Sequence, residues 1–295
     1  MPKYEYKYRL PQRRRVKVHL ILIALLVLLV LAYPFAETRM ISTQNHTLYV
    51  TNLPSNLKNI KIAYASDFHQ CMWFGQRQVD EVITRLNNLS ADIIILGGDY
   101  AMSSETAIDF FENIPSLHAR LGVFGVVGNH DRTQPESNLQ LLTDAMKDAG
   151  VTPLVNSVSR VKVGQNYLYI AGVDDFYNGL PDVKGVASQV REEDVVIFAG
   201  HSPDLIPDAQ KAQDANGSGR WFDLALFGHT HGGQINLFGY TPFRNVSDEL
   251  SARYISGWRE ENRAAVLVSN GVGTSVFPVR LFAPPQVHLI TIKAR

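Results

Sequence analysis

Cysteine is almost absent from this sequence. Cys71 is the only one in 295 residues, so no disulfide bond can form within the chain, and its place two residues after His69 is explained by ordinary packing. Internal repeats and low-complexity tracts are missing as well. Hydrophobic residues make up 45% of the chain and charged residues 19%, which is typical of a globular protein and not of a disordered one. The length fits one large domain or two modest ones.

A net charge is also missing, since 28 basic and 28 acidic residues balance. The two signs are nevertheless separated along the chain. Residues 1–17 hold seven basic side chains and one acid, Glu5, so this segment carries +6 and the remainder −6. An acidic body is a poor electrostatic partner for DNA or RNA, and we expect no nucleic-acid partner. The seven basic residues are Lys3, Lys7, Arg9, Arg13, Arg14, Arg15 and Lys17.

Charged residues are wholly lacking from residue 18 to residue 35, where Leu, Ile, Val and Ala dominate. A helix of this length would be about 27 Å long, close to the hydrocarbon thickness of a bilayer. A cleaved signal peptide fits less well because its apolar run is shorter, and a buried core helix is rarely apolar on every face. We therefore predict a basic tail at 1–17 and an uncleaved transmembrane signal anchor at 18–36. The basic flank predicts a single-pass protein of the cell (inner) membrane with an extracytoplasmic catalytic domain.

The rest of the chain, residues 46–295, is predicted to form one domain. In its first half, apolar runs alternate with segments of helical periodicity, which predicts an α/β sheet with helices on its faces. Leu53-Pro54 predicts a turn that joins the first two strands. The expected strands are residues 48–51, 60–65, 92–96 and 122–127, and the expected helices are residues 77–89, 105–117 and 138–149.

The second half has fewer helices, and its last two predicted strands follow one another without a long helix between them. A second sheet packed on the first accounts for this pattern. The predicted fold class is therefore α/β, with two packed β-sheets flanked by helices, an α/β/β/α sandwich preceded by one transmembrane helix. The expected elements are a hairpin of residues 158–163 and 167–172, a helix at 183–191, a solvated loop at 208–220, and strands at 195–199, 224–227, 264–268 and 287–292.

Five of the apolar strands end directly in polar residues that can bind metals. The carboxyl ends of strands in an α/β sheet lie at one edge, where neighbouring loops converge. Glycines before four of these blocks allow the backbone to turn sharply. A single histidine after a strand is usually an ordinary buried polar residue, but five such strand ends in succession predict one site. The candidate metal ligands are Asp67, His69, Asp99, Asn129, His201, His229 and His231.

The residue types of this set point to divalent transition metals. Two adjacent cations need a bridging carboxylate to offset their repulsion, and neutral imidazoles leave enough positive charge to attract a phosphate. Four histidines, two aspartates and one asparagine mix nitrogen and oxygen donors, which favours manganese, iron or zinc over calcium. The absence of cysteine from the set argues against a structural zinc site. We expect two divalent metal ions.

Asp-x-His, Gly-Asp, Gly-Asn-His-Asp, a lone His and Gly-His-x-His follow one another in this order. This order resembles the signature of the calcineurin-like metallophosphoesterases, from about residue 53 to the C-terminus. Segments 228–234 and 269–285 make the chain most similar to the membrane-anchored bacterial branch. The resemblance implies a sandwich of two sheets between helices and a hydrolase of phosphate esters. It also implies one metal on Asp67, His69 and His231, the other on Asn129, His201 and His229, and Asp99 as the bridge.

The resulting hypothesis is a dinuclear-metal-dependent hydrolase in which a metal-bridging hydroxide attacks phosphorus in line. His130 would stabilise the phosphoryl charge and protonate the leaving oxygen. Many family members place a second Asp three residues after the bridging one, where it partners this histidine, but here that position is Met102. Either Asp131 or no residue at all then orients His130. The pair Asp174-Asp175 is most simply a turn after a strand.

The sequence leaves open both the substrate and whether the protein is an active enzyme. The substrate is predicted to be a phosphodiester or a pyrophosphate. The alternatives are a UDP-2,3-diacylglucosamine-type pyrophosphatase and an inactive membrane-bound scaffold of the same fold. The loops after His69 and His231 are rich in large apolar residues, among them Trp73 and Phe238. These side chains either pack together or form an apolar rim for a lipid-linked substrate.

Overall fold

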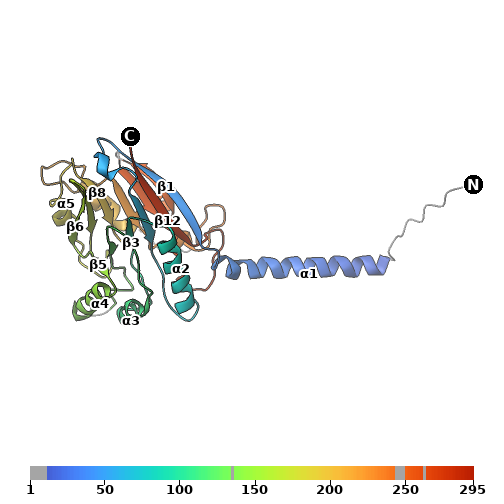
Figure 1. Cartoon of the computed structure of the whole chain (residues 1–295). Helices are drawn as coiled ribbons and strands as arrows, with labels where there is room; N and C mark the ends of the chain where they lie inside the picture. The colour runs from blue at the N-terminus through green and yellow to red at the C-terminus, as the bar shows by residue number, and fades with distance from the viewer. Residues whose placement is uncertain (1–11, 134–135, 243–249, 262–263) are drawn as a thin grey trace, which may run out of the picture.

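A computed structural model describes residues 12–133, 136–242, 250–261 and 264–295. Helix α1 (Gln12–Glu37) projects from a body of packed sheets as a single rod (Figure 1). It includes the predicted anchor at 18–36 and extends beyond it at both ends. Among the described residues, α1 is the one helix long and apolar enough to cross a membrane, and its apolar stretch is not buried against the body. Most of the basic tail lies outside the described residues.

The first sheet has six strands in the order β1-β12-β2-β3-β4-β5. β2 to β5 are parallel, whereas β12 runs antiparallel to β2 and parallel to β1. The predicted segment around Leu53-Pro54 does connect β1 to β2, but the two strands are not paired, because β12 lies between them. The backbone of Asn59 donates to Ile292 of β12, which holds the connection against that strand. The strands are β1 (Ser42–Val50), β2 (Lys61–Ala65), β3 (Ile93–Leu96), β4 (Val123–Gly125), β5 (Val151–Pro153) and β12 (Gln286–Ala294).

The second sheet has the order β10-β11-β9-β8-β7-β6. The predicted hairpin is confirmed as the antiparallel pair β6 and β7. The predicted second sheet is confirmed, and the last two predicted strands lie in different sheets. β11 belongs to the second sheet and β12 to the first, because residues 269–285 carry the chain from one sheet to the other. The strands are β6 (Ser157–Val163), β7 (Asn166–Gly172), β8 (Val195–Ala199), β9 (Leu224–Phe227), β10 (Gly257–Glu261) and β11 (Ala264–Val268).

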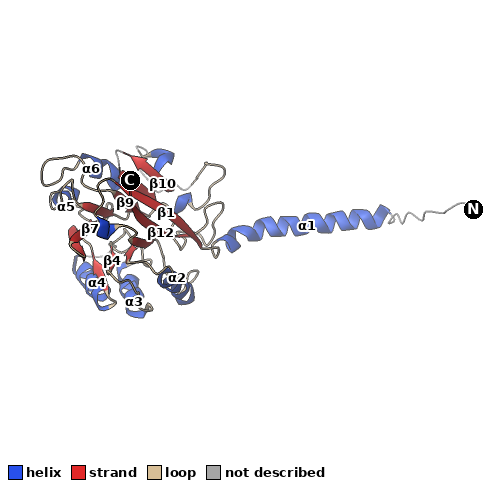
Figure 2. Ribbon diagram, turned by 45° about the horizontal axis from the view of Figure 1, so that its top comes forward, coloured by secondary structure: helices blue, strands red, loops and turns tan. Residues whose placement is uncertain are grey.

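Helices cover the outer face of each sheet, so the predicted α/β/β/α sandwich is confirmed. Figure 2 shows α2, α3 and α4 on one side of the body and α5 and α6 on another. α6 begins just before the predicted solvated loop and takes up its first residues, because its buried Ile206 and Ala209 belong to the core under the second sheet. The helices are α2 (Gln76–Asn88), α3 (Ser104–Asn113), α4 (Glu136–Asp148), α5 (Val183–Ala187) and α6 (Ile206–Lys211).

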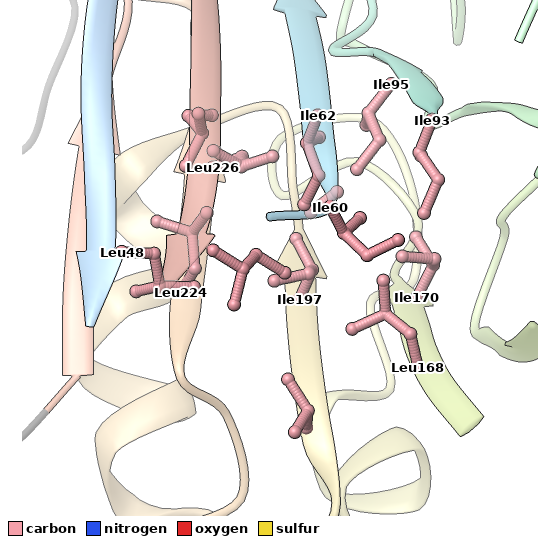
Figure 3. Close-up of a cluster of buried hydrophobic side chains, with 14 of the residues drawn as sticks. Leu48, Ile60, Ile62, Ile93, Ile95, Leu168, Ile170, Ile197, Leu224 and Leu226 are labelled. Atoms are coloured by element: carbon pink, nitrogen blue, oxygen red, sulfur yellow. The ribbon is translucent and has the colours of Figure 1, made fainter. Parts of the chain in front are cut away.

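The central core lies between the two sheets. In β3, Ile93 and Ile95 face this layer while Ile94 and Leu96 face the helices, as the period of two in a strand requires. Figure 3 shows isoleucine and leucine side chains from both sheets meeting there. Burial on both faces explains the continuous apolar runs in the sequence. The packed sheets therefore form a rigid base from which the strand-end loops project.

Candidate metal centre

All seven predicted ligands follow the carboxyl ends of strands. Asp67, Asp99 and Asn129 come after the parallel strands β2, β3 and β4 of the first sheet, with His69 two residues beyond Asp67. His201 and His229 come after β8 and β9 of the second sheet, with His231 two residues further on. The ends of both sheets meet at the same edge of the sandwich, so residues up to 164 positions apart become neighbours.

One group of donors consists of Asp67, His69 and His231, whose ligand atoms lie within 4.8 Å of one another. The Nε2 atoms of His69 and His231 are 3.1 Å apart. Nε2 of His231 is also 3.8 Å from Oδ1 of Asp67. All three residues are buried, so their donors face one another and not the solvent.

A second group consists of Asp99, His201 and His229, again with ligand atoms within 4.8 Å. Nε2 of His201 is 3.1 Å from Oδ2 of Asp99 and 3.3 Å from Nδ1 of His229. The same Oδ2 atom lies 3.3 Å from Nε2 of His69, which belongs to the first group. One oxygen of Asp99 therefore lies between the two groups.

The donor set fits divalent cations. Oδ2 of Asp67 and Oδ1 of Asn129 are buried and have no hydrogen-bond partner among the described residues. A buried polar atom without a partner costs about 1–3 kcal/mol, and a cation bound at each of these atoms would remove that cost. Imidazole nitrogens and carboxylate oxygens, gathered here, are ligands for borderline transition metals.

The pKa shifts of His229, His231 and Asp99 agree with this fit, whereas that of His201 does not, because the Asp99 carboxylate outweighs burial and raises the His201 pKa well above its usual value. Burial and the neighbouring His201 lower the pKa of His229 to about 3. Burial, His69 and the Arg280 guanidinium hold the pKa of His231 well below its usual value. Burial alone would raise the pKa of Asp99, but the adjacent imidazoles of His201 and His69 hold it well below its usual range. His229 and His231 are therefore neutral and Asp99 is ionised at neutral pH, as metal ligation requires.

The backbone at this edge is strained. Five of the seven predicted ligands have left-handed φ angles, a conformation that side chains other than glycine rarely adopt. Each such residue stores on the order of 1 kcal/mol or more, and strain of this kind is concentrated at functional sites. The angles are 55° at Asp67, 47° at His69, 55° at Asp99, 67° at His229 and 53° at His231.

Two glycines permit the close approach of the carboxylates. A Cβ atom at Gly228 would collide with Oδ2 of Asp67, and one at Gly128 would collide with Oδ1 of Asp99. The backbone then donates to these carboxylates, from His229 to Oδ1 of Asp67 and from His130 to Oδ1 of Asp99, each at 2.9 Å. Each sheet thus helps to position a carboxylate of the site.

Two residues that sequence reasoning missed hold the imidazoles in place. Arg280 is fully buried and donates to the carbonyls of His231 and Asn270, with its Nη2 3.4 Å from Nδ1 of His231. Tyr177 stacks on His229 with ring centroids 5.0 Å apart, and its hydroxyl donates to Asp204 at 2.6 Å. A lone arginine within an apolar, proline-rich segment was the available signal for Arg280.

His130 lies beside the first group, with its ring edge-on to His69 at 4.8 Å between centroids. Its Nδ1 atom is 3.3 Å from the backbone carbonyl of Met102. The alternative that Asp131 orients His130 is wrong, because the Asp131 carboxylate accepts the backbone N–H groups of Asp99, Tyr100 and Gly128. The main chain of Met102 therefore supplies the partner that its side chain cannot.

The remaining candidates have structural places. Asp174 forms a buried ion pair with Arg132 at 3.0 Å, and Asp175 accepts the backbone N–H groups of Tyr177 and Asn178. These contacts agree with the predicted turn. Cys71 packs at the edge of the core beneath the helices of the first sheet.

The calcineurin-like phosphoesterase family model matches residues 60–233, more than half of the chain. The chain belongs to this family. It is thus a metallophosphoesterase, a hydrolase of phosphoester bonds whose fold implies divalent metal ions. An uncharacterized metallophosphoesterase of Aquifex aeolicus is 30% identical over 90% of this chain and 97% of its own length.

Two further relatives are bacterial proteins of similar size. The uncharacterized metallophosphoesterase YkuE of Bacillus subtilis is 28% identical over 88% of each chain. The phosphodiesterase YaeI of Escherichia coli is 28% identical over 80% of this chain and 83% of its own. The matched family region contains all seven predicted ligands. Their individual roles as ligands stay predictions.

Proposed function

We propose that this metallophosphoesterase hydrolyses phosphodiesters with two divalent metal ions. Asp67, His69 and His231 hold one ion, Asn129, His201 and His229 hold the other, and Asp99 is shared. The observation that carries the proposal is the position of Oδ2 of Asp99, 3.3 Å from His69 and 3.1 Å from His201. The mixed nitrogen and oxygen donors favour manganese, iron or zinc.

Bound ions of this kind supply Lewis acidity and a nucleophile at neutral pH. Side chains of the protein would donate the proton and orient the ligands. Met102 O holds Nδ1–H of His130, so Nε2 of that ring is left to face the substrate and to give a proton to the leaving oxygen. Tyr177 and Arg280 keep His229 and His231 in fixed orientations, which lowers the cost of organising the site for each turnover.

A diester is proposed because the relative YaeI bears the name phosphodiesterase. The test is hydrolysis of bis(p-nitrophenyl) phosphate by the purified full-length chain. We expect activity that a chelator abolishes and that manganese, iron or zinc restores. Activity that survives complete removal of metal, or a metal-loaded protein inert toward every diester offered, would contradict the proposal.

We further propose that residues 18–36 anchor the chain in the cell membrane and that the catalytic body is extracytoplasmic. The support is the exposed apolar surface of α1 and the basic segment before it. Protease added to cells with a permeabilised outer layer should digest the body. Protection that persists until the membrane itself is broken would place the body in the cytoplasm.

A further inference from the structure

α1 joins the body without a flexible linker. The Glu37 side chain at its end is 1% exposed and accepts the backbone N–H groups of Phe282 and Ala283 at 3.0 and 2.8 Å. The backbone of Arg280 donates to the carbonyl of Pro34 at 2.9 Å. A turn of four residues then leads into β1. These bonds fix the direction of the helix relative to the body, as Figure 1 shows.

Large apolar side chains are exposed around this junction, and we call them the apolar collar. The ring of Phe282 lies near those of Tyr33 in α1 and Phe238, with ring centroids 6.2 and 5.9 Å apart. Phe35 and Trp73 line one groove of 130 Å³ at the base of the helix. Phe238 is 98% exposed and Trp73 56%. The collar consists of Phe35, Trp73, Phe238, Phe277 and Phe282.

Exposed apolar groups gathered in this way mark an interaction surface. We propose that its partner is the bilayer that α1 crosses, and that the collar lies in the interfacial layer of that bilayer. The collar surrounds the point where α1 enters the body, so whatever surrounds the last turns of α1 also reaches it. Aromatic side chains are preferred at the depth of the lipid headgroups.

This placement brings the site to the membrane surface. Trp73 lies four residues after His69, and Phe238 seven residues after His231, on loops that begin at the first group of donors. Gln234 donates to the carbonyls of Ser275 and Phe277 at 2.9 Å, which ties the loop of Phe238 to the segment that carries Phe277. On the basis of the proposed function, the substrate is then a phosphodiester in the headgroup of a lipid in the same leaflet.

Fluorescence quenching tests the placement without reference to activity. The full-length chain is reconstituted into phosphatidylcholine vesicles with or without brominated acyl chains. Subtraction of the Trp73→Phe variant isolates Trp73 from Trp221 and Trp258, the other two tryptophans. We expect the Trp73 emission to fall at least twofold in brominated vesicles.

A matched reporter sits far from the collar. Leu180 is 81% exposed on the turn before α5, and Figure 1 shows α5 at the end of the body opposite α1. Leu180→Trp in the Trp73→Phe background should show no added quenching. An unquenched Trp73, or equal quenching at both positions, would overturn the inference even if the enzyme is active.

Activity provides an independent arm. Phe238→Ser should lower hydrolysis of a phosphodiester lipid in vesicles by about tenfold, the scale of withdrawing one phenyl ring from an apolar environment, and leave bis(p-nitrophenyl) phosphate hydrolysis unchanged. An equal loss on both substrates would contradict a role in membrane contact. A quenched Trp73 in a protein that hydrolyses no diester would refute the proposed function and leave the membrane placement standing.

Discussion

The two sheets bring different chemistry to the same edge. The first contributes both carboxylates, the amide and one imidazole, that of His69. Among the predicted ligands the second contributes only imidazoles, those of His201, His229 and His231. Two carboxylates offset half of the charge of two divalent ions, and neutral imidazoles add affinity without removing more. A net positive charge is then left for phosphate. The first sheet thus supplies the negative charge of the site, and the second supplies most of its neutral imidazole ligands.

Substitutions on either sheet test this division, beginning with the largest expected effect. Asp99→Ala removes the group shared by both sets of donors, and we expect activity to fall by more than about 10⁴-fold, beyond the usual contribution of one acid–base group. His229→Ala removes a donor from only one set, so its loss of activity should be smaller. Metal content by mass spectrometry should drop from two ions to none in the first variant and to one in the second. Equal metal content in the two variants would contradict this division between the sheets.

His130 belongs to the first sheet and has no counterpart in the second. If it protonates the leaving oxygen, His130→Ala should slow hydrolysis of an alkyl diester by roughly 10²–10³-fold. A p-nitrophenyl leaving group needs no proton, so its hydrolysis should change much less. Rates measured on both substrates separate the two roles, and the same loss on each would assign His130 to charge stabilisation alone.

Arg280 lies on the segment that passes between the sheets, and its effect should appear in stability. Arg280→Met leaves the buried carbonyls of Gly273, Asn270 and Ala283 without their donor. We expect the free energy of unfolding to fall by about 3 kcal/mol, measured by urea denaturation. Arg280→Lys keeps the positive charge and some of the N–H donors, so its loss of stability should be smaller. A variant as stable as the wild type would exclude this role.

A second pair of imidazoles lies between the sheets, away from the site. His288 of β12 contacts His46 of β1 at 3.2 Å, and His46 stacks on Trp258 of β10. Burial and His46 lower the pKa of His288 to about 3, and burial lowers that of His46. Below pH 6.5 these histidines therefore bind protons in the unfolded chain but stay neutral in the folded chain. The free energy of unfolding then falls as the pH falls.

The size of this pH effect follows from the shift at His288. Between pH 7 and pH 5 the folded state should lose about 2 kcal/mol of stability through this residue. The measurement is urea denaturation at both pH values for the wild type and for His288→Asn. The difference between the two pH values should be smaller in the variant by that amount. The same pH dependence in both proteins would show that His288 is not buried in its neutral form.

The strand ends were predictable from the sequence because an apolar run followed by Gly and a donor is a local pattern. Asp99 after Ile93–Leu96 and His229 after Leu224–Phe227 are examples. β10 was not predictable, since Gly257–Glu261 is an edge strand with two acids and an arginine. The order of strands was not predictable either, because the insertion of β12 between β1 and β2 depends on contacts across more than 200 residues.

The contacts that hold His130 and His229 in place were the part of the site hardest to predict from the sequence. Nothing in the sequence near Met102 shows that its main-chain carbonyl reaches His130, because that contact depends on the path of the backbone after β3. Tyr177 was likewise one of twelve tyrosines without a distinguishing pattern. Its position against His229 follows from the turn that Asp175 organises.

We propose above that the strand ends of both sheets form one centre for two ions that share Asp99. Electron paramagnetic resonance of the full-length chain loaded with manganese(II) tests this arrangement most directly. We expect two ions per chain with an exchange-coupled signal, as for ions about 3.5–4 Å apart, and loss of the coupling in Asp99→Ala. A single bound ion, or two ions with the spectrum of isolated manganese, would contradict it.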